Sequence, residues 1–247
     1  MQNYNRDFNN ILKCLSNNNE KIEYLCEDKK ILISLVPLLS IIKPTNKRPD
    51  AIAEKGQILL LLEHFQFDNS GLNKKGSLQN QITAKTDREL TKLLKKNKKF
   101  AAIHETVKKS GVNYVENFQK QFNSHVKNID KYKLEIQGDT KRNYAKCITG
   151  FVIEDTSPFG SVYWNNNEAK CVNLLYSKEF LDLFEKTTQL DFVIFAMTEN
   201  EENKKTSFIS RKTISLHRQT QIEVSKISEF LFEDSIYFSS QIFIPCK

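Results

Sequence analysis

Glycine and proline are scarce in this 247-residue sequence, with only 7 and 5 residues respectively. Such small numbers exclude collagen-like, linker-dominated and low-complexity chains. The five cysteines are scattered and never spaced C-x-x-C, so we expect neither a disulfide framework nor a zinc site. The apolar stretch at 31–42 is too short to span a bilayer. The sequence therefore predicts a cytoplasmic protein without a membrane partner.

Several motifs of well-known enzyme classes are missing as well. The sequence contains neither G-x-x-x-x-G-K-[ST] nor G-x-G-x-x-G, which argues against a P-loop NTPase or a dinucleotide enzyme. What it does contain is basic charge, with 37 Lys and Arg against 30 Asp and Glu, a net charge of +7. Because a basic surface attracts polyanions, we expect a nucleic-acid partner, DNA rather than RNA. We also expect a homodimer or a larger complex.

The pattern of apolar residues predicts one mixed α/β domain over residues 1–247. Hydrophobic residues make up 39% of the chain, enough for a substantial core. We expect N-terminal helices over 1–47, including one over 19–30, and either a strand or more helix at 31–42. A core at 48–200 would contain a helical segment at 81–133, and a β-rich extension would cover 201–247. Helical segments alternating with strand-like segments favour this class.

Helix boundaries are predicted from capping residues. Thr86 with Glu89 forms a capping box, so a helix is expected to begin there. Gly111 is a typical helix stop, and Asn113 would cap the next helix. Ser177 precedes a short amphipathic helix and would cap it.

The segment RPDAIAEKGQILLLLEHFQFDNS, residues 48–70, predicts a strand hairpin. With Lys55-Gly56 as its two-residue turn, Asp50 and Glu63 become diagonal neighbours on one face, about 7–8 Å apart at the backbone. Two carboxylates at that separation can share Mg²⁺ or Mn²⁺, which would activate a water and neutralise charge on a phosphate. The plainer interpretation is that Asp50 caps a strand or bonds the turn.

This hairpin resembles that of the PD-(D/E)xK nuclease superfamily. Pro49-Asp50 matches the first half-motif and Glu63-His64-Phe65 the second, and the resemblance covers roughly residues 20 to 200. It implies a restriction-endonuclease-like central sheet flanked by helices: an acidic helix, the hairpin, then a helix and a strand. It also implies Mg- or Mn-dependent hydrolysis of nucleic-acid phosphodiesters, as in restriction or phage-defence systems, with Asp50 and Glu63 as metal ligands.

The sequence departs from the family pattern at Phe65, which stands where a catalytic lysine is expected. Lys75 is our candidate for the replacement, with Lys74 and Lys120 as alternatives, and Glu23 or Glu27 could assist from a preceding helix. Phe65 and Phe67 also share the face of Glu63, so that face is unusually apolar. The alternative is a catalytically degenerate nuclease fold that serves as a nucleic-acid-binding or assembly subunit.

Other candidate residues are weighed against plainer roles. Nucleic-acid contacts are expected at Lys95, Lys96, Lys98, Lys99, Lys120 and Lys127, although such a run also suits a solvated helix face. Glu168-Ala169-Lys170 is a literal E-x-K, but it follows the turn-like sequence WNNN. Glu154 and Asp155 either line a cleft at a strand end or are solvated turn acids. His64 is expected on the face opposite Glu63, as a core or helix-packing residue, and His125 at the surface or its boundary.

Overall fold

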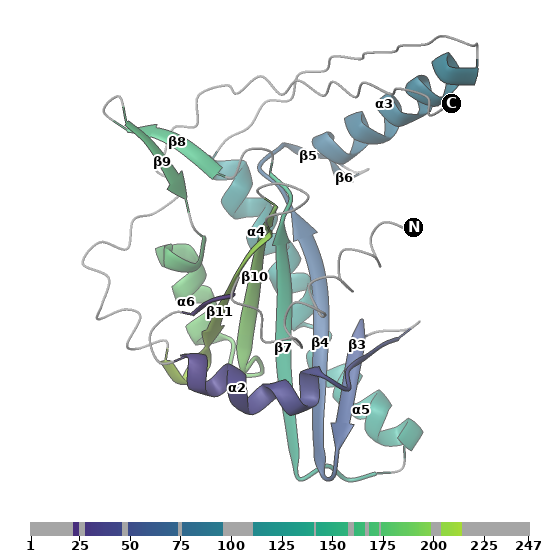
Figure 1. Cartoon of the computed structure of the whole chain (residues 1–247), viewed down its shortest axis with the longest axis vertical. Helices are drawn as coiled ribbons and strands as arrows, with labels where there is room; N and C mark the ends of the chain where they lie inside the picture. The colour runs from purple at the N-terminus through teal and green to yellow at the C-terminus, as the bar shows by residue number, and fades with distance from the viewer. Residues whose placement is uncertain are drawn as a thin grey trace.

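The computed structural model has a central β-sheet with helices on both faces (Figure 1). It describes residues 22–24, 28–45, 49–73, 76–95, 111–140, 142–157, 161–165, 168–172, 174–198 and 204–213. The strands of this sheet are β1 (Ile22–Tyr24), β2 (Lys43–Pro44), β3 (Ala51–Lys55), β4 (Ile58–Phe67), β7 (Lys146–Asp155), β10 (Phe192–Thr198) and β11 (Lys204–Ser210). Two small hairpins lie apart from it: β5 (Leu72–Asn73) with β6 (Gly76–Ser77), and β8 (Ser161–Asn165) with β9 (Glu168–Val172).

The sheet has the strand order β1-β11-β10-β7-β4-β3-β2. Strands β4, β7 and β10 are parallel, whereas β3 is antiparallel to β4 and β11 is antiparallel to β10. The helices are α2 (Asp28–Leu39), α3 (Leu78–Lys95), α4 (Gly111–Val126), α5 (Ile129–Thr140) and α6 (Lys178–Lys186), with short 3₁₀ turns η1 (Leu174–Tyr176) and η2 (Arg211–Thr213). The predicted mixed α/β class is confirmed, and the apolar stretch at 31–42 forms mostly helix.

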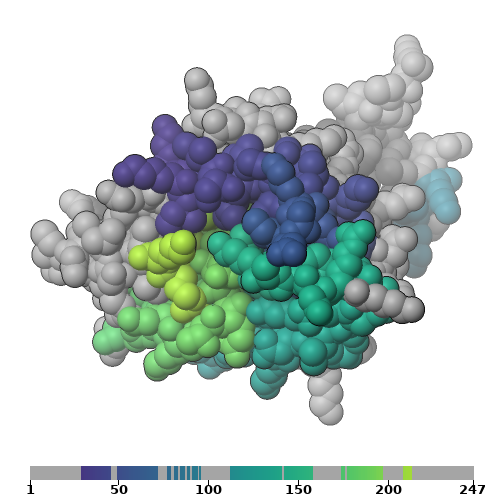
Figure 2. Space-filling view, turned by 90° about the horizontal axis from the view of Figure 1, so that it is seen from below, coloured from purple at the N-terminus to yellow at the C-terminus, as the bar shows by residue number. Residues whose placement is uncertain are grey.

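Each face of the sheet carries its own apolar core. On one face, α2 packs through Leu32, Leu35 and Leu39 against β-strand residues that include Leu60 and Leu62. On the other face, a larger aromatic core gathers under α4 and α6. Viewed from the end where the β3–β4 hairpin turns, the purple segment with α2 lies on one side, and the green and teal segments lie opposite (Figure 2). Both sides of the central strands are therefore buried, which explains the uninterrupted apolar run of β4.

The turn of the β3–β4 hairpin lies one residue later than predicted. Lys55 pairs with Ile58, so Gly56 and Gln57 form the two-residue turn. Gly56 has φ +61°, a left-handed conformation that glycine adopts without a Cβ penalty. Because the turn still has two residues, placing it one residue later shifts the pairing of β3 with β4 by two residues. A shift by two leaves the alternation of faces unchanged, so the same side chains still share each face.

Three predicted helix boundaries are wrong. Residues 22–24 form strand β1, because parallel pairing with β11 outweighs their local helical pattern. Helix α3 begins at Leu78, so Thr86 is an interior, buried residue rather than a cap. Gly111 is the first residue of α4 rather than the end of a helix, which places Asn113 inside the helix. The Ser177 cap is confirmed, because its Oγ accepts a hydrogen bond from the Phe180 N–H.

The predicted segments of the chain fit the described residues in part. The helical segment at 81–133 corresponds to α3, α4 and part of α5, with residues 96–110 outside the described residues. Residues 204–210 of the expected β-rich extension are strand β11, and 214–247 lie outside the described residues. Residues 1–21 also lie outside them.

Candidate functional site

Asp50 and Glu63 lie across from each other at the β3–β4 hairpin. The ladder pairs Ala51 with Leu62, and continuing it by one residue places Asp50 directly opposite Glu63. The two side chains therefore project from the same face, closer together than the diagonal pair that we predicted. Asp50 Oδ2 accepts a hydrogen bond from the His64 backbone N–H at 2.8 Å. The Asp50 carboxylate thus ties the two strands together at the open end of the hairpin.

The Glu63 carboxylate is held by a histidine from α4. Its Oε2 lies 2.8 Å from Nδ1 of His125, and the two residues are only 1% and 8% exposed. The His125 imidazole also stacks on Phe65, with ring centroids 4.9 Å apart. His125 is therefore buried, contrary to the surface or boundary position that we expected. The spacing from Phe118 and Phe122 on α4 is the sequence pattern that places residue 125 on the buried stripe.

Phe65 and Phe67 close this face of the sheet. They are 3% and 4% exposed, and Phe67 packs against the rings of Tyr114 and Phe118 from α4. A protein-bound Mg²⁺ usually keeps several of its waters in near-octahedral geometry. Glu63, which is 1% exposed and bonded to His125, does not fit a hydrated ion of that kind. Asp50 is half-buried and bonded to the His64 backbone.

Two of the remaining candidates for such a centre lie among the described residues, each on another element of the fold. Glu23 lies on β1, separated from β4 by β11, β10 and β7, which at about 4.8 Å per strand is roughly 19 Å. Lys120 is exposed on the outer side of α4. Glu27, Lys74 and Lys75 lie outside the described residues. Within the part of the chain that the structure describes, no three His, Cys, Asp or Glu residues are grouped as metal ligands.

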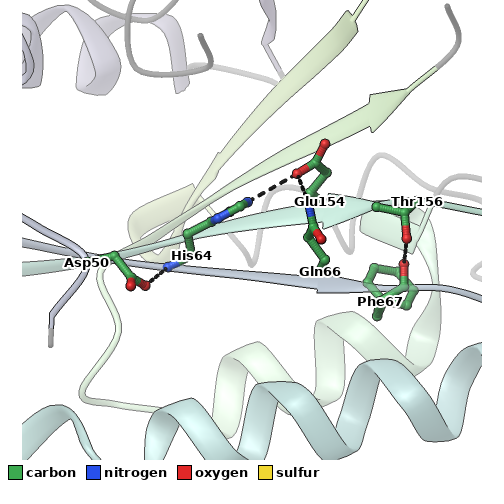
Figure 3. Close-up of polar contacts among 6 residues, drawn as sticks. All are labelled: Asp50, His64, Gln66, Phe67, Glu154 and Thr156. Carbon is green, nitrogen blue, oxygen red and sulfur yellow. Dashed lines mark hydrogen bonds and ion pairs between the residues drawn. The ribbon is translucent and has the colours of Figure 1, made fainter. Parts of the chain in front are cut away.

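A second polar cluster lies on the opposite face of β4 and β7 (Figure 3). His64 Nε2 is 3.2 Å from Glu154 Oε2, and the same oxygen accepts a hydrogen bond from Gln66 Nε2 at 2.8 Å. Glu154 is only 3% exposed, so the solvated-turn interpretation of this acid is wrong. His64 lies on the face opposite Glu63, as predicted, and is buried there. This cluster links β4 to β7 by side chains as well as by backbone.

Polar side chains also cluster where β4 ends. Asp68 Oδ1 accepts hydrogen bonds from the N–H and the Oγ of Ser70, and its Oδ2 accepts one from Ser77 Oγ. Asn117 Nδ2, on α4, donates to the carbonyls of Asp68 and Ser70 at 2.8 and 2.7 Å. We call these four residues the 68–117 clamp. It fastens the chain between β4 and α3 onto helix α4.

The adjacent end of β7 is fixed to the same helix. Asp155 is 2% exposed, its Oδ2 accepts a hydrogen bond from the Tyr114 hydroxyl at 2.8 Å, and its Oδ1 accepts one from the Ser157 N–H. Neither Asp155 nor Glu154 is therefore a solvated turn acid. Glu168 and Lys170, the literal E-x-K, lie on β9 of the small β8–β9 hairpin, apart from both polar clusters.

The predicted nucleic-acid lysines fall on different elements. Lys95 is exposed in the last turn of α3, whereas Lys120 and Lys127 are exposed on or just after α4. Lys96, Lys98 and Lys99 lie outside the described residues. The structure thus separates Lys95 from the α4 lysines.

A comparison of the chain with protein-family models, curated proteins and solved structures finds no match. Among the described helices, none has the length and apolar character needed to cross a membrane.

Proposed function

We propose that this chain is a nucleic-acid-binding protein built on a nuclease-like core that does not hydrolyse phosphodiesters at Asp50 and Glu63. The order of elements supports the resemblance to the PD-(D/E)xK superfamily. Helix α2 precedes three antiparallel strands, β2, β3 and β4, and helices α4 and α5 then lead to β7, which is parallel to β4. A helix, a strand hairpin, a helix and a further strand are what that resemblance implies.

The state of Glu63 is the observation that favours the non-catalytic alternative. Its carboxylate is 1% exposed and bonded to His125, and Phe65 occupies the place of the expected lysine. A phosphodiester and its attacking water need open access to the metal and to the general base. The buried Glu63 carboxylate offers neither, so Glu63 serves the fold.

Charge supports nucleic acid as the partner. The chain carries a net charge of +7, and its described cations are largely on the surface. Neutralising phosphates releases counterions, so binding of this kind weakens steeply as salt increases. DNA remains our first choice over RNA, and the function includes assembly into a homodimer or larger complex.

The test measures binding and cleavage with the same full-length protein. Fluorescence anisotropy with labelled duplex DNA, single-stranded DNA and RNA, at about 50 to 200 mM salt, should show salt-sensitive binding. Incubation of the same nucleic acids with Mg²⁺ or Mn²⁺ should show no cleavage, and Glu63→Gln should bind like the wild type. Absence of binding to all three nucleic acids would overturn the proposal.

Hydrolysis is the second candidate, because Asp50 and Glu63 do project from one face of the hairpin. Metal-dependent cleavage that disappears in both Glu63→Gln and Asp50→Asn would establish it and remove the non-catalytic proposal. His64→Gln serves as the control, since His64 lies on the opposite face.

A further inference from the structure

Helix α3 has a continuous stripe of positive charge along one side. Lys85, Arg88, Lys92 and Lys95 are spaced by three, four and three residues, which places them on one face of a helix. All four side chains are exposed. Within the described part of the chain, Arg88, Lys92 and Lys95 form no ion pair. We call these four residues the α3 stripe.

Glu89 lies away from the centre of this stripe. At 100° per residue, it is about 80° from the mean direction of the four cations. Glu89 therefore borders the stripe on one side. The stripe keeps an excess of positive charge along its whole length.

The opposite side of α3 is less exposed than the stripe. Thr86 is 5% exposed, and Ile82 and Leu93, at related helical positions, are partly buried. A helix lying on a lipid surface would instead expose a broad apolar face beside its cations. The exposed side chains around the stripe include Ala84 and Thr91, so its surroundings suit a hydrated polyanion better than a membrane.

The base of α3 is fixed to the body of the protein. Ser77, the residue before the helix, joins the 68–117 clamp through its Oγ. The Leu78 N–H donates to the Gly71 carbonyl at 2.8 Å, which closes the loop over the first turn. From this anchor α3 runs outward, beyond the end of the sheet towards which β4 and β7 point (Figure 1). The stripe is thus carried on a helix whose first turn is held by hydrogen bonds to the body of the protein.

The length of the stripe fits a nucleic-acid backbone. Ten residues of helix span about 15 Å, and the cations follow one another at about 4.5 to 6 Å. Since phosphates of one DNA strand rise by about 3.4 Å along the helix axis, 15 Å corresponds to about four phosphates. Four cations on a straight helix can therefore meet about four phosphates of one strand.

We propose that the α3 stripe is the surface that binds the phosphate backbone of nucleic acid, an inference that rests on the proposed function. The stripe contributes affinity without base specificity, because Lys and Arg contacts to phosphate carry no sequence information directly. Lys95 then contacts the phosphate backbone together with Lys85, Arg88 and Lys92. Lys120 and Lys127, two other lysines expected to bind nucleic acid, do not take part in this contact.

The experiment compares two triple variants with the same loss of charge. The stripe variant carries Arg88→Gln, Lys92→Gln and Lys95→Gln and so lacks three cations of the stripe. The control variant lacks three exposed cations from elsewhere, through Lys120→Gln, Lys127→Gln and Lys178→Gln. Glutamine is a good helix former, so both should stay folded, as circular dichroism and thermal melting would verify. Binding to labelled duplex DNA is measured across about 50 to 200 mM salt.

The stripe variant should lower the slope of log affinity against log salt by about 2.7, which is about 0.9 per lost contact. The control variant should change the slope little. Equal losses in the two variants, or wild-type binding by the stripe variant, would overturn the inference while leaving the proposed function intact. If wild-type protein binds no nucleic acid, the proposed function itself fails.

Two further probes test the kind of polyanion. Vesicles containing anionic phosphatidylserine and an acidic polyglutamate peptide are added as competitors of labelled DNA. Weak competition by both is expected. If either displaces DNA as well as unlabelled DNA does, and its own binding is lost in the stripe variant, the stripe is a surface for lipid or acidic protein and the inference is wrong.

Discussion

His125 Nδ1 lies 2.8 Å from Glu63 Oε2, and this contact joins α4 to the second strand of the hairpin across 62 residues of sequence. The same imidazole stacks on Phe65, so a single side chain meets both residues of the Glu63-x-Phe65 pattern. A carboxylate below an apolar layer needs such a partner, because burying it unpaired would cost several kcal/mol. The contact explains why an acid is tolerated within this core.

Replacing His125 by phenylalanine should therefore destabilise the protein. The substitution keeps a ring to stack on Phe65 but removes the donor to Glu63. We expect the free energy of unfolding to fall by about 3 kcal/mol, as when one partner of a buried ionic contact is removed. Urea denaturation followed by circular dichroism measures the change.

The double variant Glu63→Leu with His125→Phe is the control for this prediction. Replacing both partners by apolar groups is often nearly neutral, so most of the lost stability should return. A double variant as unstable as His125→Phe alone would show that the contact does not hold the helix to the hairpin. Nucleic-acid binding should survive in the double variant if Glu63 has no catalytic or binding role.

The 68–117 clamp gives a prediction that connects stability with binding. Asn117→Leu removes the amide that donates to the carbonyls of Asp68 and Ser70. Leaving two buried carbonyls without this donor should lower the free energy of unfolding by about 2 to 3 kcal/mol. DNA affinity should also fall, because the base of α3 loses its anchor.

Hydrogen exchange over residues 68–78 measures this loosening, and anisotropy with duplex DNA measures the loss of affinity. Asn123→Leu, an exposed substitution on the same helix, should change neither. If Asn117→Leu is destabilised but binds DNA like the wild type, then the clamp does not position the α3 stripe.

Local patterns were sufficient for much of the fold. The alternation of side chains along a strand fixes which residues share a face, so Asp50 and Glu63 were assigned to one face even though the turn was placed one residue too early. The Ser177 cap also depends on adjacent residues alone. These features need no knowledge of the rest of the chain.

Features that depend on distant residues were missed. Strand β1 exists because residues 22–24 pair with β11, more than 180 residues later in the chain. The partner of Glu63 is on α4, and the partner of His64 is Glu154 on β7. An acid at the end of an apolar run looks the same in sequence whether it faces a metal or a histidine. Only the packing of α4 distinguishes the two.

Arg211 fixes the end of α6, and its replacement by lysine should weaken the fold. The guanidinium donates to the carbonyls of Phe184, Glu185, Thr187 and Leu190, and it lies 4.9 Å from the centre of the Phe184 ring. Burial lowers the pKa of this group, and Asp191 and Glu185 oppose the shift. Lysine keeps the charge but cannot form the planar fork of hydrogen bonds.

We therefore expect Arg211→Lys to lower the free energy of unfolding by about 2 kcal/mol, as measured by denaturant titration. Lys212→Arg, at the neighbouring exposed position, is the control and should be neutral. An Arg211→Lys protein as stable as the wild type would mean that charge at the C-terminal end of α6 is sufficient and that the hydrogen-bond fork adds little.

Gly150, in the middle of β7, is needed for close packing of the sheet against α2's side of the core. A Cβ at this position would lie 2.2 Å from Cζ of Phe192 and 2.8 Å from Cδ2 of Leu62. Phe192 is the neighbour of Gly150 on β10, and Leu62 is its neighbour on β4. Both side chains are fully buried, so a shift of either displaces other core atoms. Gly150→Ala should lower the free energy of unfolding by about 3 kcal/mol, at the upper end for overpacked cores. The matched variant Gly138→Ala, in α5, has open space around the new Cβ. It should raise the free energy of unfolding by up to about 1 kcal/mol, because alanine has a higher helix propensity than glycine. Similar melting temperatures for Gly150→Ala and Gly138→Ala would contradict the packing described for β7.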